Sequence, residues 1–516
     1  MADASRARGL ALELLRDDGA AVYLNGRELL RNNLPGGRLR PTTRAPMAIG
    51  SDREDERIRL TLPPDLLASG ANVLAAAVYQ HDPASEDLRF ELALVLASAA
   101  EPPRLVRGPY LQQVTGTGAV VRFGTSRLAR GRVRYGAAPD ALAREVLAEA
   151  EALDHELALP GLAPGSRVYY AVGTTEGDLA GGDADHVFST APPADAPTRA
   201  RIWVTGDPGT ATAPAHAVRD AYLAHAGERP AELWLTLGDN AYPSGTPSEL
   251  QANFFDLYAA VLRRTALWPA LGNHDLEARD PLRGGFAYFH VFTLPEAGEA
   301  GGAPSGSEHY YSFDWGRIHV VVLDSAGSHR GAEGPMLQWL RQDLATYEGD
   351  WLLAAFHHAP ASRGTHHDGR EQSAAAMRQL AVPLLEAAGV DLVLAGHNHN
   401  YERSYLLRGP HPGRWAFEPM RIESRASGRR EAGEAYRKGP GGSDGAVYVV
   451  AGSAGQTGEA PLDHPAMAVS LAIHGSVVVD IDGCRLDAVF VDEAGVVRDG
   501  FGIEKAGCGA PSSNER

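Results

Sequence analysis

Five short apolar segments in the chain each end in a loop that is rich in metal-binding residue types. The segments are residues 202–204, 233–235, 267–271, 351–356 and 392–394. Apolar runs of this length between turn residues are typical of buried strands, and in open α/β sheets ligands gather beyond the carboxyl ends of the strands. Strand-like and helix-like segments alternate from residue 198 onward, which predicts an α/β layered domain in which the five loops converge.

The five loops share Gly, Asp, Asn and His, and one of them ends in tyrosine. They are Gly206-Asp207-Pro208-Gly209, Gly238-Asp239-Asn240-Ala241-Tyr242, Gly272-Asn273-His274-Asp275, His357-His358 and Gly396-His397-Asn398-His399. Each loop alone is typical of an ordinary turn, because Gly, Asn and Asp supply turn geometry at little cost. Five such loops, each after an apolar segment, predict a metal site instead. Carboxylate and imidazole ligands without nearby thiolates favour iron, zinc or manganese and disfavour a structural zinc knot.

The residue types in these loops fit a pair of metal ions and a hydrolytic reaction. Two ions roughly 3.5–4 Å apart need a bridging carboxylate, ligands for each ion, and an open position where water becomes the hydroxide that attacks phosphorus. Asp239 is the natural bridging residue. The sequence therefore predicts a two-metal phosphoester hydrolase.

The order of the loops resembles the purple acid phosphatase branch of the metallophosphoesterases. The blocks of that family are D-x-G, G-D-x-x-Y, G-N-H-D/E, V-x-x-H and G-H-x-H, and Tyr401-Glu402-Arg403 follows the last block as in the plant-type enzymes. Only the fourth block departs from the pattern, since Ala354 stands where the family has Val. The resemblance covers roughly residues 103 to 505.

The resemblance implies a ligand set that is divided between a ferric ion and a divalent ion. Fe(III) would be bound by Asp207, Tyr242 and His399, a divalent Zn, Fe or Mn ion by Asn273, His357 and His397, and both by the bridging Asp239. Generic metallophosphoesterases resemble D-x-H in the first block and lack the tyrosine of the second. Here Gly209 takes the place of that histidine, and the hard, anionic phenolate of Tyr242 favours Fe(III).

Three further histidines are expected to act on the substrate. The family spacing W-x5-H-x4-S selects His357 as the ligand of the fourth block, and the same count places His366 and His367 where plant-type members have paired histidines. Together with His274, these residues are expected to bind phosphate oxygens or to protonate the leaving alcohol, since imidazole changes charge near the operating pH. A solvated surface position is the alternative for His366 and His367.

Other polar residues near the blocks are expected to be structural. His358 fits a satisfied structural histidine better than a catalytic one, and Asp275 is expected to orient its own loop rather than to touch metal. Glu402 and Arg403 are expected to form a structural ion pair.

The length of 516 residues and an apolar content of 44% predict about three domains. Residues 1–100 show alternating Leu88, Phe90, Leu92 and Leu94, and resemble a galactose-binding-like jelly-roll β-sandwich that looks truncated at its start. Residues 103–193 resemble the fibronectin-III-like β-sandwich that precedes the catalytic domain of plant-type purple acid phosphatases. The resemblance implies a calcineurin-like αββα sandwich over residues 198–506, followed by a tail at 507–516.

Charge and composition limit the partners and the location. A formal net charge of −17 argues against nucleic acid or an anionic membrane as partner, since both need clustered Lys and Arg. A small phosphate ester drawn by the metals is the expected substrate. The first residues lack the apolar segment of a secretory signal, whereas the resemblance implies a secreted or periplasmic protein. Cys484 and Cys508 either form one disulfide or remain two thiols.

Three functions compete at this stage. The main prediction is a phosphomonoesterase, and the alternative is a phosphodiesterase or cyclic-nucleotide phosphodiesterase on the same site, because loops 276–308 and 404–445 shape the pocket. A third possibility is an adhesion protein with a silent catalytic domain, but a full ligand set argues against it. The jelly-roll-like domain offers no aromatic platform for carbohydrate, so a structural spacer is favoured over carbohydrate contact.

Overall fold

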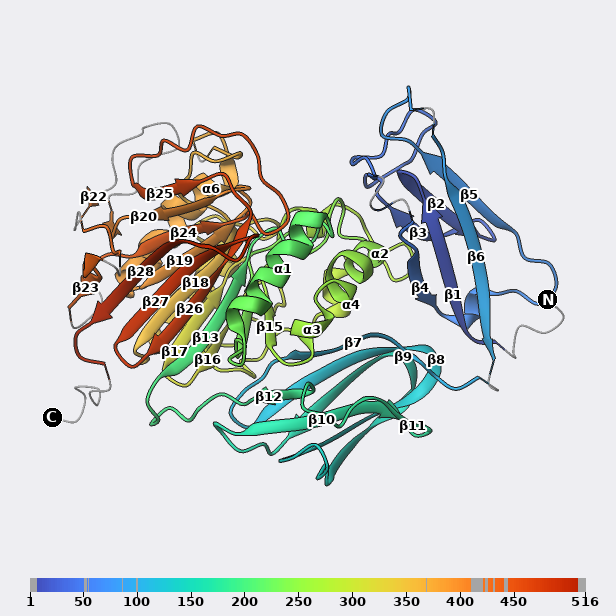
Figure 1. Cartoon of the computed structure of the whole chain (residues 1–516), viewed down its shortest axis with the longest axis horizontal. Helices are drawn as coiled ribbons and strands as arrows, with labels where there is room; N and C mark the ends of the chain where they lie inside the picture. Colours follow the sequence, from blue (N-terminus) through green and yellow to red (C-terminus); the bar gives the residue numbers. More distant parts are fainter. Residues whose placement is uncertain are drawn as a thin grey trace.

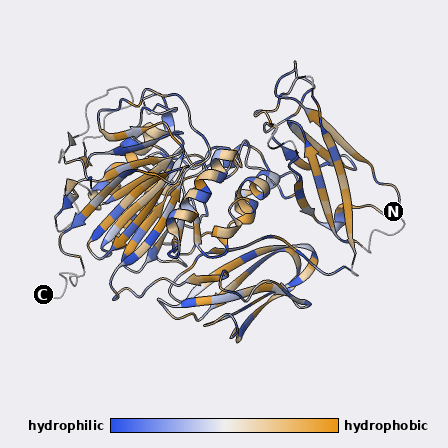
Figure 2. Ribbon diagram, viewed as in Figure 1, coloured by the Kyte–Doolittle hydropathy of each residue, from blue (hydrophilic) through white to orange (hydrophobic). Residues whose placement is uncertain are grey.

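The computed structural model comprises three bodies, two of them built from strands and the third from two sheets flanked by helices (Figure 1). It describes residues 7–50, 53, 55–85, 87–98, 101–367, 369–409, 421–422, 426–429, 432–439 and 444–508. Apolar and polar residues alternate along many of the strands (Figure 2), which is the pattern of sheets with one buried face. The fold therefore confirms a multidomain chain with two β domains before an α/β domain.

The N-terminal body is a sandwich of two small sheets. One sheet has the order β4 (Ile58–Leu62), β1 (Ala7–Arg16), β6 (Phe90–Ser98), and the other has β3 (Arg27–Asn32), β2 (Gly19–Leu24), β5 (Leu74–Tyr79). Leucines of β1 and β4 and Val22 of β2 fill the core between them. The predicted alternation extends too far at one end, because β6 begins at Phe90 and the side chain of Leu88 is 64% exposed.

The second body consists mainly of antiparallel strands. They are β7 (Leu105–Gln112), β8 (Gly118–Gly136), β9 (Arg144–Pro160), β10 (Arg167–Thr174), β11 (Gly177–Gly181) and β12 (Val187–Ser189). Strand β8 pairs with β7, β9 and β10. Because β7 also pairs in parallel with β15 of the third body, through Leu111 and Ala266, the two bodies share one continuous sheet.

The third body contains two facing sheets. The first has the order β15 (Ala266–Pro269), β14 (Leu233–Thr236), β13 (Arg199–Thr205), β26 (Gly475–Asp482), β27 (Arg485–Asp492), β28 (Val497–Lys505), β23 (Tyr436–Lys438). The second has the order β16 (Tyr311–Trp315), β17 (Ile318–Val322), β18 (Trp351–His358), β19 (Leu392–Gly396), β24 (Val447–Ala451), β20 (Tyr401–Ser404), β25 (Met467–Leu471). Four of the five apolar segments identified in the sequence lie within β13, β14, β18 and β19, and the segment 267–271 begins on β15 and runs past its end at Pro269.

Helices cover the outer faces of both sheets. On the first sheet, Trp203 of β13 stacks on Tyr222 of α1 (Ala213–Ala226), with ring centroids 4.0 Å apart. On the second sheet, Ala354 of β18 packs in a buried cluster with residues of α5 (Pro335–Thr346) and α7 (Val382–Ala387). This arrangement confirms the predicted αββα sandwich. It also accounts for Ala354, whose side chain packs toward the helices while the metal-ligand loop begins further along the strand.

The remaining elements are short. They are α2 (Pro247–Leu250), α3 (Ala259–Leu262), α4 (Tyr288–Val291), α6 (Gln372–Ala376), β21 (Leu407–Arg408), β22 (Arg421–Ile422), the 3-10 turns Pro64–Leu66 and His274–Leu276, and the π-helical turns Gln251–Asp256 and Met377–Ala381. None of the helices in the described part of the chain is long and apolar enough to cross a bilayer. Cys484 and Cys508 are free thiols that interact with each other, and burial together with that contact raises the pKa of Cys508 to about 12. Most of the predicted tail, and much of loop 404–445, lies outside the described residues.

Candidate metal centre

The candidate site lies where the carboxyl ends of strands from both sheets meet. Asp207 follows β13, Asp239 follows β14 and Asn273 follows β15, while His357 is the last residue but one of β18 and His397 follows β19. Strands β13, β14 and β15 are parallel neighbours, and so are β18 and β19. Two facing sheets therefore supply the donors, which is why loops far apart in the sequence reach one site.

Backbone geometry turns several of these residues sharply into the site. Asp207, Asp239 and His397 have φ angles of 58°, 55° and 66°, in the left-handed region that side-chain-bearing residues rarely adopt. Glycines allow the loops to approach one another closely: a Cβ on Gly272 would lie 2.1 Å from Asp239 Oδ1. A Cβ on Gly209 would lie 2.1 Å from the carbonyl oxygen of Asn240, so this loop conformation excludes a histidine at that position.

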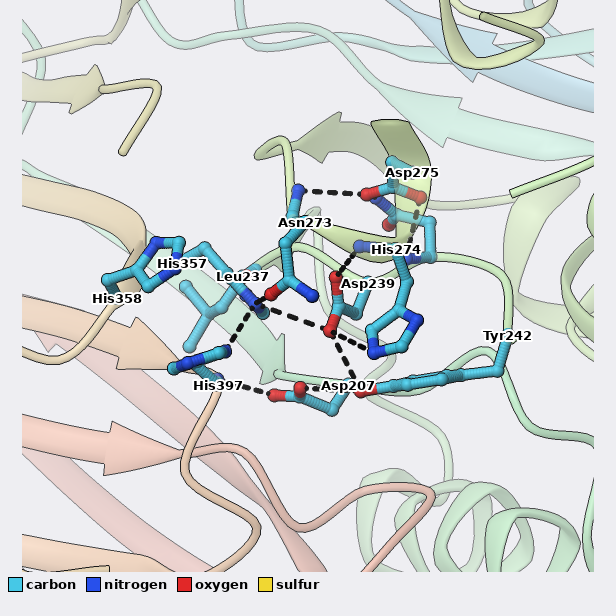
Figure 3. Close-up of polar contacts among 12 residues, drawn as sticks. Asp207, Leu237, Asp239, Tyr242, Asn273, His274, Asp275, His357, His358 and His397 are labelled. Atoms are coloured by element: carbon cyan, nitrogen blue, oxygen red, sulfur yellow. Dashed lines mark hydrogen bonds and ion pairs between the residues drawn. The ribbon is translucent and has the colours of Figure 1, made fainter. Parts of the chain in front are cut away.

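A first group of donor atoms surrounds the phenol oxygen of Tyr242. Tyr242 Oη lies 2.9 Å from Asp207 Oδ1, 2.9 Å from Asp239 Oδ2 and 3.3 Å from His399 Nε2. The same His399 nitrogen lies 3.6 Å from Asp207 Oδ1. Four donors from three loops are thus within mutual reach, and Figure 3 shows the Tyr242 ring pointing at the two carboxylates.

A second group of donor atoms surrounds His357. His357 Nε2 lies 3.0 Å from Asn273 Oδ1, 3.1 Å from His397 Nδ1 and 3.3 Å from Asp239 Oδ2 (Figure 3). Asp239 Oδ2 therefore belongs to both groups. Donors that each bind an ion at roughly 2.0–2.2 Å lie about 3 Å from one another, so both groups fit a metal ion and Asp239 fits a bridging ligand.

Hydrogen bonds within the protein already orient the candidate metal-donor side chains. His357 Nδ1 lies 2.8 Å from the carbonyl oxygen of Leu237, which turns its Nε2 toward the other donors. The backbone N–H of His274 donates to Asp239 Oδ1 (2.9 Å), and that of His397 donates to Asp207 Oδ2 (2.8 Å). Each carboxylate is thus anchored by one oxygen and presents the other, the arrangement expected of preorganised ligands.

The electrostatics of the site favour a cation. Burial alone would raise the pKa of Asp239, but the adjacent His357 lowers that pKa well below its ordinary value. Burial alone would lower the pKa of His357, but the charge of Asp239 raises it to about 10. Burial and the charges of Asp207 and Asp239 raise the pKa of Tyr242 well above its ordinary value. Two buried carboxylates within reach of a phenol need positive charge to compensate them.

Two of the three histidines predicted to act on substrate lie beside these donors. The ring of His274 packs on that of Tyr242 at 4.4 Å, and its Nε2 lies 4.0 Å from Asp239 Oδ2. The ring of His366 packs on that of His397 at 4.0 Å. His367 is placed differently, because its Nδ1 accepts a hydrogen bond from the N–H of Gly369 (2.9 Å), and its predicted contact with substrate stays a prediction.

Comparison with known proteins agrees with this geometry. Residues 200–401 match the calcineurin-like phosphoesterase family. Purple acid phosphatase 15 of Arabidopsis thaliana is 30% identical over 274 residues, which cover 48% of this chain and 49% of that protein. Residues 200–401 thus form a calcineurin-like phosphoesterase domain, and the chain is similar in sequence to purple acid phosphatases. An uncharacterised protein of Mycobacterium tuberculosis is 32% identical over 199 residues, covering 35% of this chain and 36% of that protein.

Solved structures share the fold of the chain at low sequence identity. The purple acid phosphatase PPD1 from yellow lupin (Lupinus luteus) seeds superposes with a TM-score of 0.62 at 14% identity, covering 95% of this chain and 90% of that one. The structure of PhoD superposes with a TM-score of 0.56 at 14% identity, covering 79% and 91%. The chain spans at most about half the length of the curated relatives it matches, as with the Arabidopsis protein at 49%.

Within the phosphoesterase domain, several residues have the structural roles expected of them. His358 Nδ1 lies 2.9 Å from Ser325 Oγ, and the His358 N–H donates to the same oxygen at 2.9 Å. Asp275 accepts hydrogen bonds from the N–H of Gly272 (2.9 Å) and from the N–H of Asn240 (3.0 Å), so it ties the second and third metal loops together. Burial and the charge of Asp239 raise the pKa of Asp275 to about 7.

The predicted ion pair between Glu402 and Arg403 is wrong. Arg403 is buried and donates through Nε to Asp499 Oδ2 (2.6 Å) on β28, whereas Glu402 accepts a hydrogen bond from Ser362 Oγ. The physical reason is the strand itself: consecutive residues of β20 point to opposite faces of the sheet, so their side chains cannot meet.

Glu371 is the residue of this site that the sequence did not reveal. Its Oε2 lies 2.8 Å from His397 Nε2, the nitrogen that faces away from the other donors, and His358 Nε2 lies 3.9 Å from the same oxygen. A histidine that binds metal through one nitrogen generally donates its other N–H to a carboxylate or carbonyl. That rule predicts a carboxylate or carbonyl near His397. Which residue supplies it is known only from the structure, in which the segment after β18 brings Glu371 to His397.

Proposed function

We propose that the chain is a phosphomonoesterase with a binuclear metal centre of the purple acid phosphatase type. Asp207, Tyr242 and His399 would hold Fe(III), Asn273, His357 and His397 would hold the divalent Zn, Fe or Mn ion, and Asp239 would contribute to both. The observation that supports this most strongly is the phenol oxygen of Tyr242, which lies within 3.3 Å of donors from three other residues. A phenol so placed is a ligand position rather than a core contact.

The pair of ions, when bound, supplies an activated water and neutralises charge on the phosphate. The residues of the chain supply the rest. Asp207 and Asp239 are buried and anchored, so the negative charge that holds the cations is preorganised. Nδ1 of His274 lies 2.6 Å from the carbonyl oxygen of Pro243, which turns its Nε2 to the side of Asp239 Oδ2, 4.0 Å away. There we propose that Nε2 meets a phosphate oxygen or a leaving alcohol.

His366 is proposed to share the second task. Its ring packs against that of His397, and its backbone N–H donates to Asn398 Oδ1 (2.7 Å), which fixes the loop that carries it beside the second donor group. Protonation of the leaving oxygen needs an imidazole within hydrogen-bond reach of the substrate. Of the paired histidines, His366 packs against His397, which supports this role for it, and His367 retains only the support of the spacing.

The visible absorption spectrum tests the proposal, with iron, zinc and manganese quantified on the same sample. A phenolate bound to Fe(III) gives a broad charge-transfer band in the visible range. We expect the purified protein to show such a band and Tyr242→Phe to lose it. The control is Tyr448→Phe on β24, which removes a buried hydroxyl that donates to Glu386, and it should keep the band. A colourless protein that contains two divalent ions would contradict the ferric assignment.

The substrate class is tested separately. We expect faster hydrolysis of nitrophenyl phosphate than of bis(nitrophenyl) phosphate, and the reverse order would favour the phosphodiesterase alternative on the same donors. Loop 276–308 lies within the described residues and is the first place to seek determinants of this choice. Export from the cytosol and carbohydrate contact by the N-terminal domain stay predictions.

A further inference from the structure

The N-terminal β-sandwich docks directly on the segment that follows Tyr242. Ser244 Oγ donates to the carbonyl oxygen of Leu34 (3.0 Å), and Ser248 Oγ donates to that of Arg31 (3.1 Å). Figure 1 shows the same contact at the level of elements, with β3 and β4 of the sandwich facing α2. The domain that looks like a spacer in the sequence therefore contacts a loop of the metal centre.

Glu249 is one link across this interface. Its Oε2 accepts from the N–H groups of Ser244 and Thr246 (both 3.0 Å), which closes the turn after Tyr242 as a helix capping box. Its Oε1 accepts from the backbone N–H of Asn33 in the N-terminal domain (3.0 Å). A single buried carboxylate thus joins the tyrosine loop to the neighbouring domain.

Arg53 is a second link, and it reaches two metal loops at once. Its Nη1 donates to the carbonyl oxygen of Thr210 (3.0 Å), in the loop that begins with Asp207. Its Nη2 lies 3.5 Å from Asn253 Oδ1, and Asn253 Nδ2 in turn donates to the carbonyl oxygen of Tyr242 (2.9 Å). The guanidinium is held in place by Glu56 of its own domain, at 2.9 Å.

The packing around these contacts is tight. A cavity of ≈ 10 Å³ lies between the domains, lined by Arg16, Arg53, Asn253, Tyr242 and Pro243 among others. That volume is about that of one water molecule, so Arg53 and Tyr242 line the same small space. A planar guanidinium with several donors suits such a bridge better than a single ammonium group.

We propose that Arg53 is a positioning residue of the metal centre: by joining Thr210 to Asn253 it fixes the loop of Asp207 relative to the loop of Tyr242, and so makes the N-terminal domain part of the ferric site. This inference rests on the proposed function for its spectroscopic consequence. Arg53 touches neither substrate nor donor atom, and it acts on Tyr242 through Asn253.

The test compares three variants of the full chain. Arg53→Met removes the hydrogen bonds to Thr210 and Asn253. Arg53→Lys keeps the positive charge but cannot donate to both groups with the planar geometry of a guanidinium. Arg27→Met is the matched control, because Arg27 Nη2 also crosses the domain interface, to the carbonyl oxygen of Leu282 (2.7 Å), but away from the tyrosine loop. The readouts are the maximum and intensity per iron of the visible band, and the hydrogen exchange of residues 242–253.

We expect Arg53→Met to shift the visible band and to speed exchange of residues 242–253 by about tenfold, the effect of losing one charge-assisted hydrogen bond. Arg53→Lys should restore part of both signals, and Arg27→Met should match the wild type. If Arg53→Met proves insoluble, Glu56→Gln, which only loosens the anchor of Arg53, should give a smaller change in the same direction.

Two results would overturn the inference. One is an Arg53→Met protein with wild-type band and exchange; the other is equal loosening by Arg53→Met and Arg27→Met, which would reveal general domain docking only. In both cases a coloured, iron-containing wild type would leave the proposed function standing. A colourless wild type would contradict the ferric assignment, while the exchange data would still decide the role of Arg53.

Discussion

At the scale of single residues, the centre depends on carboxylates that hold other groups in place. Asp239 presents one oxygen to both donor groups and fixes the other on the N–H of His274. Glu371 does not face the other donors, but its carboxylate holds His397 in place through His397 Nε2. The pattern implies that metal affinity also depends on residues that are not themselves metal donors.

Glu371→Gln should therefore weaken binding of the divalent ion by roughly 10–100-fold, the usual effect of removing a carboxylate behind a metal-binding histidine. Glutamine retains an acceptor for His397 but not the negative charge that raises its ligand strength. Calorimetric titration of Zn²⁺ or Mn²⁺ into metal-depleted protein measures this without reference to activity. Glu386→Gln, a change of the same kind on α7, serves as the control. Equal affinity in both variants would show that Glu371 does not act on the metal.

The sequence could predict that the donor loops meet, because each follows an apolar segment and the carboxyl ends of such strands gather at one edge of a sheet. The division of their residues between two ions came from the family resemblance and stays a prediction. Glu371 and Arg53 were not predictable, since each reaches the centre through packing between segments distant in the chain. The prediction for Glu402 and Arg403 is wrong for a related reason. The two residues are adjacent in sequence, but consecutive side chains of a strand point to opposite faces of the sheet.

At the scale of elements, one buried histidine joins two strands and a helix. His319 on β17 lies 2.7 Å from Asp314 Oδ1 on β16 through Nδ1, and 2.9 Å from Asp343 Oδ2 on α5 through Nε2. Burial alone would lower its pKa, but the hydrogen bonds to Asp314 and Asp343 raise it to about 9. The partners of His319 are set by the tertiary fold and leave no pattern in the sequence.

This cluster predicts a pH dependence of stability. The pKa of His319 is higher in the folded than in the unfolded chain, so its stabilising contribution is complete below the unfolded value near 6.5 and is lost as pH rises through about 9. The full contribution is at most about 3 kcal/mol for a shift of this size. Urea unfolding of wild type and His319→Gln should differ most at pH 6 and least at pH 10. A difference that is constant with pH would refute the account.

At the scale of the whole molecule, the centre joins parts that the sequence presents as separate. Asp207, Asp239 and Asn273 follow strands of the first sheet, and His357 and His397 belong to strand ends of the second. The N-terminal domain is hydrogen-bonded to the segment that follows Tyr242. The apolar segments predicted the strands and the family blocks implied the two-sheet sandwich. The docking of the domains was not predictable, because it depends on polar contacts such as Glu249 with Asn33 that carry no sequence pattern.

Because the ions would be held by both sheets, their removal should lower the stability of the molecule as a whole. Binding contributes RT ln(1 + [L]/Kd), about 4 kcal/mol when free metal is a thousandfold above Kd. For a chain of 516 residues this corresponds to a fall of roughly 4 °C in the unfolding midpoint on chelation. Calorimetry of chelated and reloaded protein measures this fall and its reversal. Asp239→Asn, which removes the charge shared by both donor groups, should unfold at the same temperature with or without chelator. If chelation leaves the wild-type midpoint unchanged, or if the fall persists in Asp239→Asn, then the ions are not held between the two sheets by this carboxylate.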